Sequence, residues 1–257
     1  MENSISVVNF TNYKDSIKKA LDGINAKEIL SKQKQILIKP NCVEAYKFPV
    51  TTHPDSVEVI IDYIRDCSNS NIIIAEGTGA MSKETDEVFE ILGYKKLTKD
   101  KNIELIDLNK EKLIKLKNNN FQIFKEYYMP EIAFNSFIIS VPVLKAHSIS
   151  IVTLSLKNMM GFAPPKYYQK NGFWKKSFFH NYIHEALIEI NHYRSADIIV
   201  LDASVGLAEF HLGGKECNPK VNKIIAGIDS LEVDKIGTEL LNMDWEIIPH
   251  IKNYNNI

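Results

Sequence analysis

The sequence is poor in arginine: of its 31 basic residues, only Arg65 and Arg194 are arginines. Guanidinium clamps are therefore scarce, and a bound anion has to rely on lysine, backbone N–H groups or a metal ion. Net charge is also nearly absent, because 31 basic and 32 acidic residues leave a formal charge of −1. General nucleic-acid-binding proteins are normally basic on one face, so we expect no nucleic-acid partner.

Cysteine is scarce as well, since Cys42, Cys67 and Cys217 lie far apart and form no C-x-x-C pair. The chain therefore contains no iron–sulfur motif and no cysteine-rich zinc site. No apolar run approaches the roughly 20 residues that span a bilayer, and the segment MENSISVVNF lacks the pattern of a secretory signal. These features predict a cytoplasmic protein with reduced thiols and no membrane partner.

The sequence alternates strand-like apolar runs with helix-like segments. The expected strands are 35–39, 71–75, 103–108, 137–143, 196–202 and 222–228, and the expected helices are 53–67, 82–92, 179–193, 229–241 and 245–253. Several runs are apolar throughout, which is typical of strands covered by helices on both faces. We predict one α/β domain over residues 1–257, a layered fold with a central, mainly parallel sheet flanked by helices. Alternating segments within 110–128 predict a β-hairpin at its edge.

The most informative stretch is 136–161, where polar side chains follow directly on the end of an apolar strand. They are Lys145, His147, Thr153, Lys157 and Asn158. Ligand sites of open parallel sheets lie at such strand ends, so we expect a site here. A desolvated lysine beside another ammonium loses basicity, so Lys157 is interpreted as an activated amine or an anion clamp. His147 is the expected acid–base group and Lys145 the charge stabiliser; two surface lysines and a packed histidine are the alternative.

Further candidates for substrate binding stand at other strand ends and helix starts. They are Lys39, Asn41, Thr52, His53, Glu76 and Asp202. Thr52 and His53 open a helix whose N-terminus attracts anions, and Thr52 is the expected cap. Glu76 precedes a Gly-containing turn, and Asp202 directly ends an apolar strand, where a base or a ligand often stands. Ordinary capping and turn chemistry are the alternatives.

His180 and His184 are spaced i, i+4, which places two imidazoles on one helix face, as a helical metal site requires. A pair of surface histidines is the alternative, so the cofactor stays unknown and a bound transition metal stays open. The segment 162–177 is rich in proline, aromatic residues and lysine. It is interpreted as a loop that serves as a lid, as a docking surface, or as neither.

Motifs spread along the chain occur together in a known order. They are KPN at 39–41, TTHP at 51–54, VPVLKAH at 141–147, T-x-x-x-K-N-x-x-G at 153–161 and D-x-x-x-V-D at 229–234. With them the sequence resembles the prokaryotic family called domain of unknown function 362, from about Gln35 to about His250. That family has no settled general activity. Some members carry a ferredoxin-like module that is absent here, so the resemblance implies that any cluster chemistry would come from a ferredoxin-like partner protein.

A more distant resemblance is to the nickel-pincer lactate racemase family. Lys157 takes the place of the lysine that covalently carries the nickel cofactor, and His147 that of the histidine in the P-x-H sequence. His180 or His184 would then correspond to the later nickel ligand. Leu156 stands where the racemases have a basic residue. The resemblance therefore implies a shared ancestor and not a shared reaction.

Two main classes of function follow from the sequence. The first is an enzyme that acts on a small anionic substrate, with or without a metal or redox step, at a site rich in lysine and histidine. The second is a non-catalytic accessory or electron-transfer partner of an iron–sulfur protein. A racemase or epimerase related to the nickel-pincer enzymes is a third reading.

Overall fold

The computed structural model describes residues 4–99 and 103–257. The strands of its main sheet are β1 (Ile5–Asn9), β2 (Gln35–Pro40), β3 (Asn71–Glu76), β4 (Glu104–Asp107), β7 (Phe137–Val141), β8 (Val143–His147), β9 (Ile151–Thr153), β10 (Ile198–Leu207) and β11 (Lys223–Gly227). A second, small sheet holds β5 (Leu113–Lys117) and β6 (Glu126–Pro130).

Helices fill most of the connections between these strands. The α-helices are α1 (Tyr13–Asp22), α2 (Ala26–Leu30), α3 (Pro54–Arg65), α4 (Thr85–Leu92), α5 (Lys96–Lys99), α6 (Ser155–Asn158), α7 (Pro165–Tyr168), α8 (Ile183–Tyr193), α9 (Ser230–Leu240) and α10 (Pro249–Lys252). Short 3-10 helices are η1 (Glu131–Ala133), η2 (Met159–Phe162), η3 (Ser177–Asn181) and η4 (Trp245–Ile247).

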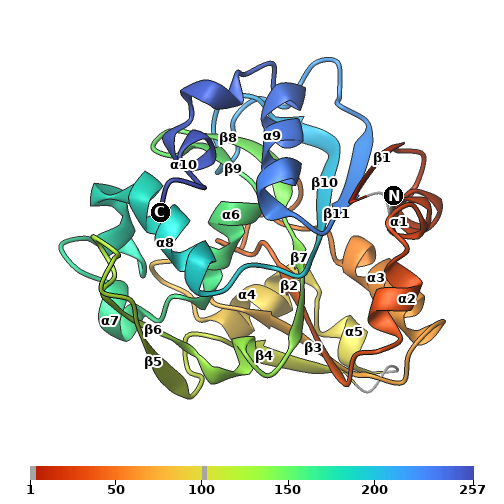
Figure 1. Ribbon diagram of the computed structural model, residues 1–257. Coiled ribbons are helices and arrows are strands. Elements are labelled where there is room, and N and C mark those ends of the chain that lie inside the picture. Colours follow the sequence, from red (N-terminus) through yellow and green to blue (C-terminus); the bar gives the residue numbers. More distant parts are fainter. Residues whose placement is uncertain (1–3, 100–102) are drawn as a thin grey trace.

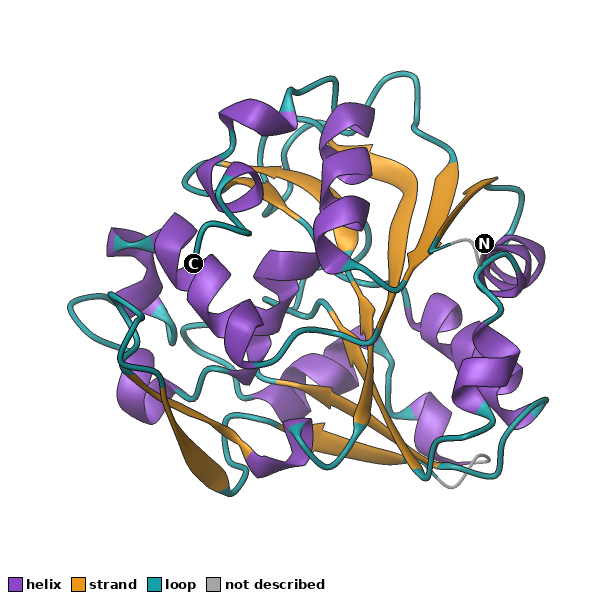
Figure 2. Cartoon of the chain, in the orientation of Figure 1, coloured by secondary structure: helices purple, strands orange, loops and turns teal. Residues whose placement is uncertain are grey.

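The main sheet is mostly parallel, and the predicted α/β architecture is confirmed. Its strand order is β1-β11-β10-β7-β2-β3-β4, with β8 paired to β10 and β9 paired to β8. The pairs among β2, β3, β4, β7 and β10 run parallel, whereas β1, β11 and β9 join antiparallel. Helices α1 to α3 lie on one side of the sheet and α6, α8 and α9 on the other (Figures 1 and 2).

Alternation along the central strand separates two hydrophobic cores. Ile36 and Ile38 of β2 face the core that contains α1 and α3, and Leu37 faces the core that contains α8 and α9. Because successive side chains of a strand point to opposite faces, Lys39 at the end of β2 shares the face of Leu37. The charged end of this buried strand is thereby directed toward α6.

Two helices begin later in the structure than the sequence pattern predicted. His53, not Thr52, is the N-cap of α3, because its Nδ1 accepts the N–H of Asp55 at 3.2 Å. The Thr52 hydroxyl instead donates to the Val141 carbonyl at 2.6 Å, so it joins β7 to the start of α3. The helix expected over 179–193 begins only at Ile183, after the separate 3-10 turn η3.

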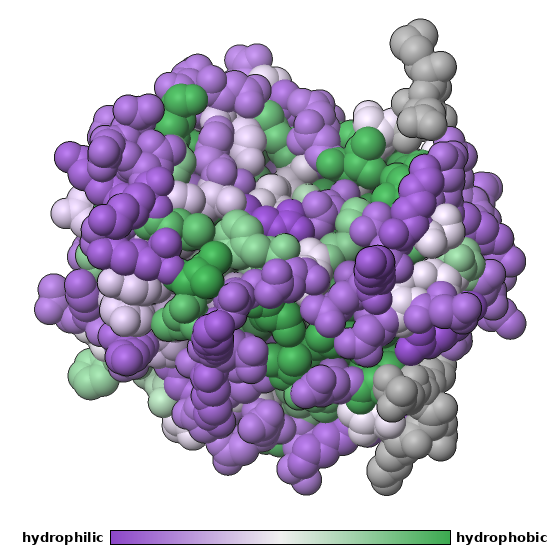
Figure 3. Space-filling model, turned by 60° about the horizontal axis from the view of Figure 1, so that its bottom comes forward, coloured by the Kyte–Doolittle hydropathy of each residue, from purple (hydrophilic) through white to green (hydrophobic). Residues whose placement is uncertain are grey.

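The hairpin expected within 110–128 is present as β5 and β6, but it forms its own two-stranded sheet and is not paired to the edge of the main sheet. On the face shown in Figure 3, hydrophilic residues predominate and hydrophobic residues surface between them in patches. Across residues 4–99 and 103–257, no helix combines the length and the apolar character needed to cross a membrane.

Candidate functional site

A cavity of about 240 Å³ opens at the carboxyl ends of β2, β3 and β8. The chain passes from β2 to β3 on one side and later returns to β7 on the other. Open α/β sheets form their ligand crevices at such a reversal of strand order. The cavity is lined by these residues expected from the sequence: Lys39, Asn41, Glu76, Lys145, His147, Thr153, Lys157, Asn158 and His180.

A buried ion pair forms part of the cavity wall. Lys39 Nζ donates to both carboxylate oxygens of Glu76 at 2.9 Å, and the two side chains are 0% and 3% exposed. The carboxylate also accepts the N–H groups of Cys42 at 3.0 Å and Gly77 at 2.8 Å. All these bonds compensate the charge of Glu76, which makes the carboxylate a fixed counter-ion.

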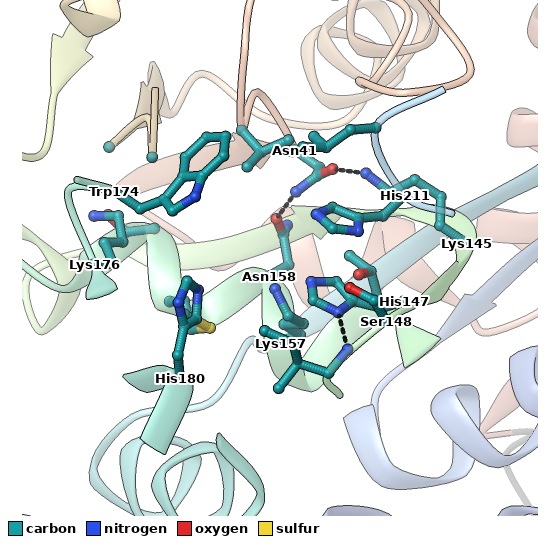
Figure 4. A pocket seen from close by; sticks show the side chains of 18 of the residues that line it. Asn41, Lys145, His147, Ser148, Lys157, Asn158, Trp174, Lys176, His180 and His211 are labelled. Carbon is teal, nitrogen blue, oxygen red and sulfur yellow. Dashed lines mark hydrogen bonds between the residues drawn. The ribbon is translucent and has the colours of Figure 1, made fainter. Parts of the chain in front are cut away.

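Two asparagines connect this ion pair to the next lysine. Asn158 Oδ1 accepts from Lys39 Nζ and from Asn41 Nδ2, both at 3.2 Å. Asn41 Oδ1 in turn accepts from Lys145 Nζ at 2.5 Å, and Lys145 also donates to the Val50 carbonyl at 2.6 Å (Figure 4). Burial and the nearby charge of Lys157 lower the pKa of Lys145 to about 7. Lys145 therefore has a fixed direction and a charge that depends on pH near neutrality.

Lys176 is a lining residue that the sequence did not single out, although the loop 162–177 was noted. Its ammonium donates to the carbonyls of Ala163 at 2.5 Å and Gly161 at 3.3 Å, and to Asn109 Oδ1 at 3.0 Å. Burial lowers the pKa of Lys176 to about 7. Trp174 of the same loop also lines the cavity. The loop thus contributes to the site, and its use as a lid or a docking surface stays a prediction.

Lys157 differs from its three neighbours. It is partly buried, and its ammonium has neither a hydrogen-bond nor an ion-pair partner within the described part of the chain. In Figure 4 it points from α6 into the space between His147 and His180. Burial lowers the pKa of Lys157 to about 8. The neutral amine is therefore a minor form at pH 7 and about half of the population at about pH 8.

The position of Lys157 is set by a buried carboxyl group behind α6. Asp234 of α9 accepts the N–H groups of Ser155 at 2.7 Å and Leu156 at 3.0 Å, the two residues that begin this short helix. Asn191 of α8 donates to the Leu156 carbonyl at 2.9 Å. Burial raises the pKa of Asp234 to about 8. Two flanking helices thus hold the turn that carries the free lysine.

The imidazole of His147 has a defined tautomer. Its Nδ1 accepts the N–H groups of Ile149 at 3.0 Å and Ser150 at 3.3 Å, so the ring proton resides on Nε2. Burial and the charge of Lys157 lower the pKa of His147 far below its ordinary value. His147 is therefore a neutral donor through Nε2, which has no free lone pair for a metal ion.

His211, from the connection between β10 and β11, stacks on His147 with ring centroids 3.7 Å apart. Its Nδ1 is buried without a partner among the described residues, as is the hydroxyl oxygen of Thr153. Burial and the charge of Lys157 lower the pKa of His211 to about 3. The sequence gave no reason to choose His211. The His211 ring reaches His147 only because the long connection between β10 and β11 folds back toward the cavity.

Four expected site residues lie away from the cavity. Asp202 accepts from Tyr13 at 2.9 Å, on the α1 side of the sheet, because its position on β10 has the same parity as Val200 in that core. The side chains of Thr52 and His53 form hydrogen bonds at the start of α3. His184 faces His250, with their Nδ1 atoms 2.9 Å apart, whereas His180 lines the cavity.

The expected His180–His184 pair therefore does not share one helix face, since His180 precedes the start of α8. Within residues 4–99 and 103–257, no group of three or more His, Cys, Asp or Glu side chains has an arrangement suited to a metal ion. What the site offers is a cluster of donors, namely the lysine ammonium groups and the Nε2–H of His147. Such a cluster favours a ligand rich in acceptor oxygens.

Comparison with known proteins agrees with both resemblances noted in the sequence. A family model described as a domain of unknown function (DUF362) matches residues 36–239. No curated protein matches the sequence. A solved structure with a similar fold is the lactate racemase apoprotein from Thermoanaerobacterium thermosaccharolyticum, at 14% identity and a TM-score of 0.60. The match covers 91% of this chain but only 56% of that chain.

Proposed function

We propose that this chain, which belongs to the DUF362 family, is an enzyme that binds a small organic anion in the lysine-lined cavity and uses Lys157 as its reactive group. The observation that carries the proposal is the contrast among four lysines. Lys39, Lys145 and Lys176 are held by acceptors within the protein, whereas Lys157 is not. Hydrogen bonds fix the directions of the three held lysines, whereas the amine of Lys157 is free to contact a ligand.

Among the held lysines, Lys145 would bind the anionic group of the substrate. Its carbonyl and amide acceptors fix its direction and leave one N–H for a ligand, so little side-chain entropy is lost when an anion binds. A bound anion would also restore the basicity of this amine, because an opposite charge favours the protonated form. The three N–H groups of Lys176 already have acceptors, so Lys176 would add only positive charge to another wall of the cavity.

Lys157 would act as a base or a nucleophile through its neutral amine, which requires a pKa near the working pH. The Nε2–H of His147 lies on the same cavity and would stabilise negative charge that develops on a substrate oxygen. The neighbouring walls include Trp174, Met160 and Phe210, which give part of the cavity an apolar lining.

The donor groups of the cavity suit a small carboxylic acid, and the similar fold of lactate racemase makes lactate one candidate to test. The direct test is a calorimetric binding screen of lactate, pyruvate, malonate and phosphate against the wild type and two variants. We expect at least one anion to bind the wild type, to bind K145M at least tenfold more weakly, and to bind the surface variant K47M as well as the wild type. Equal binding by all three proteins would contradict the proposal.

A further inference from the structure

The surroundings of Lys157 favour one type of chemistry over the others that a lysine can perform. Within the described residues no carboxylate pairs with its ammonium, so nothing in the protein holds it in the charged form. The groups around it are neutral imidazoles, His147 on one side and His180 on the other (Figure 4). An uncompensated amine between neutral donors is suited to attack an electrophilic carbon.

We infer that Lys157 forms an imine with the carbonyl carbon of a 2-oxo acid, whose carboxylate is bound by Lys145. This inference rests on the proposed function and narrows its substrate class. The geometric basis is that the free amine of Lys157 and the directed ammonium group of Lys145 line the same cavity, and that Lys145 keeps one N–H for a ligand after donating to Asn41 and Val50. A 2-oxo acid presents the matching pair of groups, an electrophilic carbon bonded directly to a carboxylate.

The size of the cavity agrees with this class. A volume of about 240 Å³ is large enough for a small organic acid such as a 2-oxo acid of three to five carbons.

The reaction balances without an oxidant or a reductant. The lone pair of the neutral Lys157 amine adds to the carbonyl carbon, the C–N bond forms, and an amine proton moves to the former carbonyl oxygen. The resulting carbinolamine then loses its hydroxyl group together with one proton as water, and the C=N bond forms. One amine and one carbonyl thus give one imine and one water.

Two groups in the cavity suit the proton transfers of these steps. His147 presents an Nε2–H that can donate to the carbonyl oxygen as negative charge develops on it. The Thr153 hydroxyl is buried without a partner among the described residues and lines the same cavity. A hydroxyl can both donate and accept, so Thr153 is suited to pass a proton between the amine and the departing oxygen.

The experiment is reductive trapping. The whole protein is incubated with pyruvate and sodium cyanoborohydride, and the product is analysed by intact mass and peptide mapping. We expect one reduced pyruvyl adduct per chain, on the peptide that contains Lys157. The variants K157M and K157R should lose this adduct, and the exposed-lysine variant K47M should keep it. Thermal melts of both Lys157 variants verify that they are folded.

The outcomes separate the inference from the proposed function. If glyoxylate, pyruvate, 2-oxobutyrate and 2-oxoglutarate leave Lys157 unmodified while lactate or phosphate still binds in the K145M-sensitive manner, the imine is wrong and the anion-binding enzyme stands. Adducts spread evenly over surface lysines, and retained in K157R, likewise overturn the inference. If none of these anions binds at all, both proposals fail.

Discussion

Lys39 and Glu76 form a bidentate ion pair at the carboxyl ends of two adjacent parallel strands, with both side chains withdrawn from solvent. Their charges are compensated further by two backbone N–H groups and by Asn158. The pair is therefore a structural part of the cavity wall. Removing either side chain should first of all lower the free energy of unfolding.

Replacing Glu76 by Ala should lower the free energy of unfolding by about 3–5 kcal/mol, because it leaves the Lys39 ammonium buried and unpaired. Urea denaturation measures the change. The double variant E76A/K39M should recover part of the loss, since it removes the orphaned charge. A loss below about 1 kcal/mol in E76A would mean that the pair is hydrated or rearranged in solution.

Gly161 ends the T-x-x-x-K-N-x-x-G motif and packs against this ion pair. A Cβ at that position would overlap Glu76 Oε1 and Lys39 Cε. We therefore expect Gly161→Ala to destabilise the protein by about 1–3 kcal/mol and to weaken anion binding. Gly79→Ala is the matched control, because its Cβ would meet Val43 Cγ2 at an ordinary 3.6 Å and Gly79 lines the same cavity. Similar losses in both variants would count against this explanation.

Asp234 should be needed for the placement of Lys157. Asp234→Ala leaves the N–H groups of Ser155 and Leu156 unpaired, which costs about 1–3 kcal/mol for each buried group. Reductive trapping at Lys157 should slow in the same variant. A stable D234A protein with unchanged trapping would show that α6 keeps its position without this cap.

The same carboxyl should give stability a dependence on pH. Its folded pKa is raised by burial from 3.8 to about 8. The folded protein therefore binds more protons than the unfolded chain between those values, and this contribution is full below about pH 4 and is lost as the pH rises to about 8. Urea denaturation across this range should show that the wild type loses stability with rising pH relative to D234N, because the amide of Asn does not titrate. A constant difference would place the carboxyl in its ionised form throughout.

Anion binding should weaken as pH rises through neutrality. Burial lowers the pKa of Lys145 and Lys176 to about 7 and that of Lys157 to about 8, so all three lose charge in this range. Sulfate is a suitable probe, because its own charge stays constant. Calorimetry in buffers of different ionisation enthalpy should show proton uptake on binding. Affinity that stays level into the alkaline range would show that these amines remain charged.

His147 should remain neutral through the physiological range, with its proton on Nε2. Burial lowers its pKa, and two backbone N–H groups occupy its Nδ1. Nitrogen-15 NMR of the histidine rings should report an unchanging Nε2–H tautomer at this position. The exposed His53 offers a comparison, since its ring lies 39% exposed beside Asp55. Titration of His147 near its ordinary pKa would remove it from the role of fixed donor.

Much of the fold was predictable because buried parallel strands are apolar throughout their length. The runs at Gln35–Pro40 and Asn71–Glu76 show this pattern, and each is a strand with a polar residue at its carboxyl end. Strand β1 was not predicted, since its five residues are half exposed at the edge of the sheet and lack such a run. The central strands of a sheet are therefore easier to predict from the sequence than a strand at its edge.

The site was predictable only where strand order determines position. Lys39 and Lys145 come together because they stand near the carboxyl ends of strands at one edge of the sheet, and Lys157 follows β8 and β9 on the short helix α6. Asp202 also stands on a strand, yet the parity of its position directs it to the opposite face, where it meets Tyr13. The long connections of the chain contribute three further lining residues, Trp174, Lys176 and His211. Tertiary packing brings these connections to the cavity, and a local sequence pattern cannot predict that packing.

The acceptors that hold Lys145 and Lys176 are mostly main-chain carbonyls, Val50 on one connection and Ala163 on another. The positive field of the cavity is thus assembled during folding and needs little reorganisation when a ligand arrives. Redesign of this scaffold for a different anion should therefore retain the backbone of both connections and vary only the residues at the mouth.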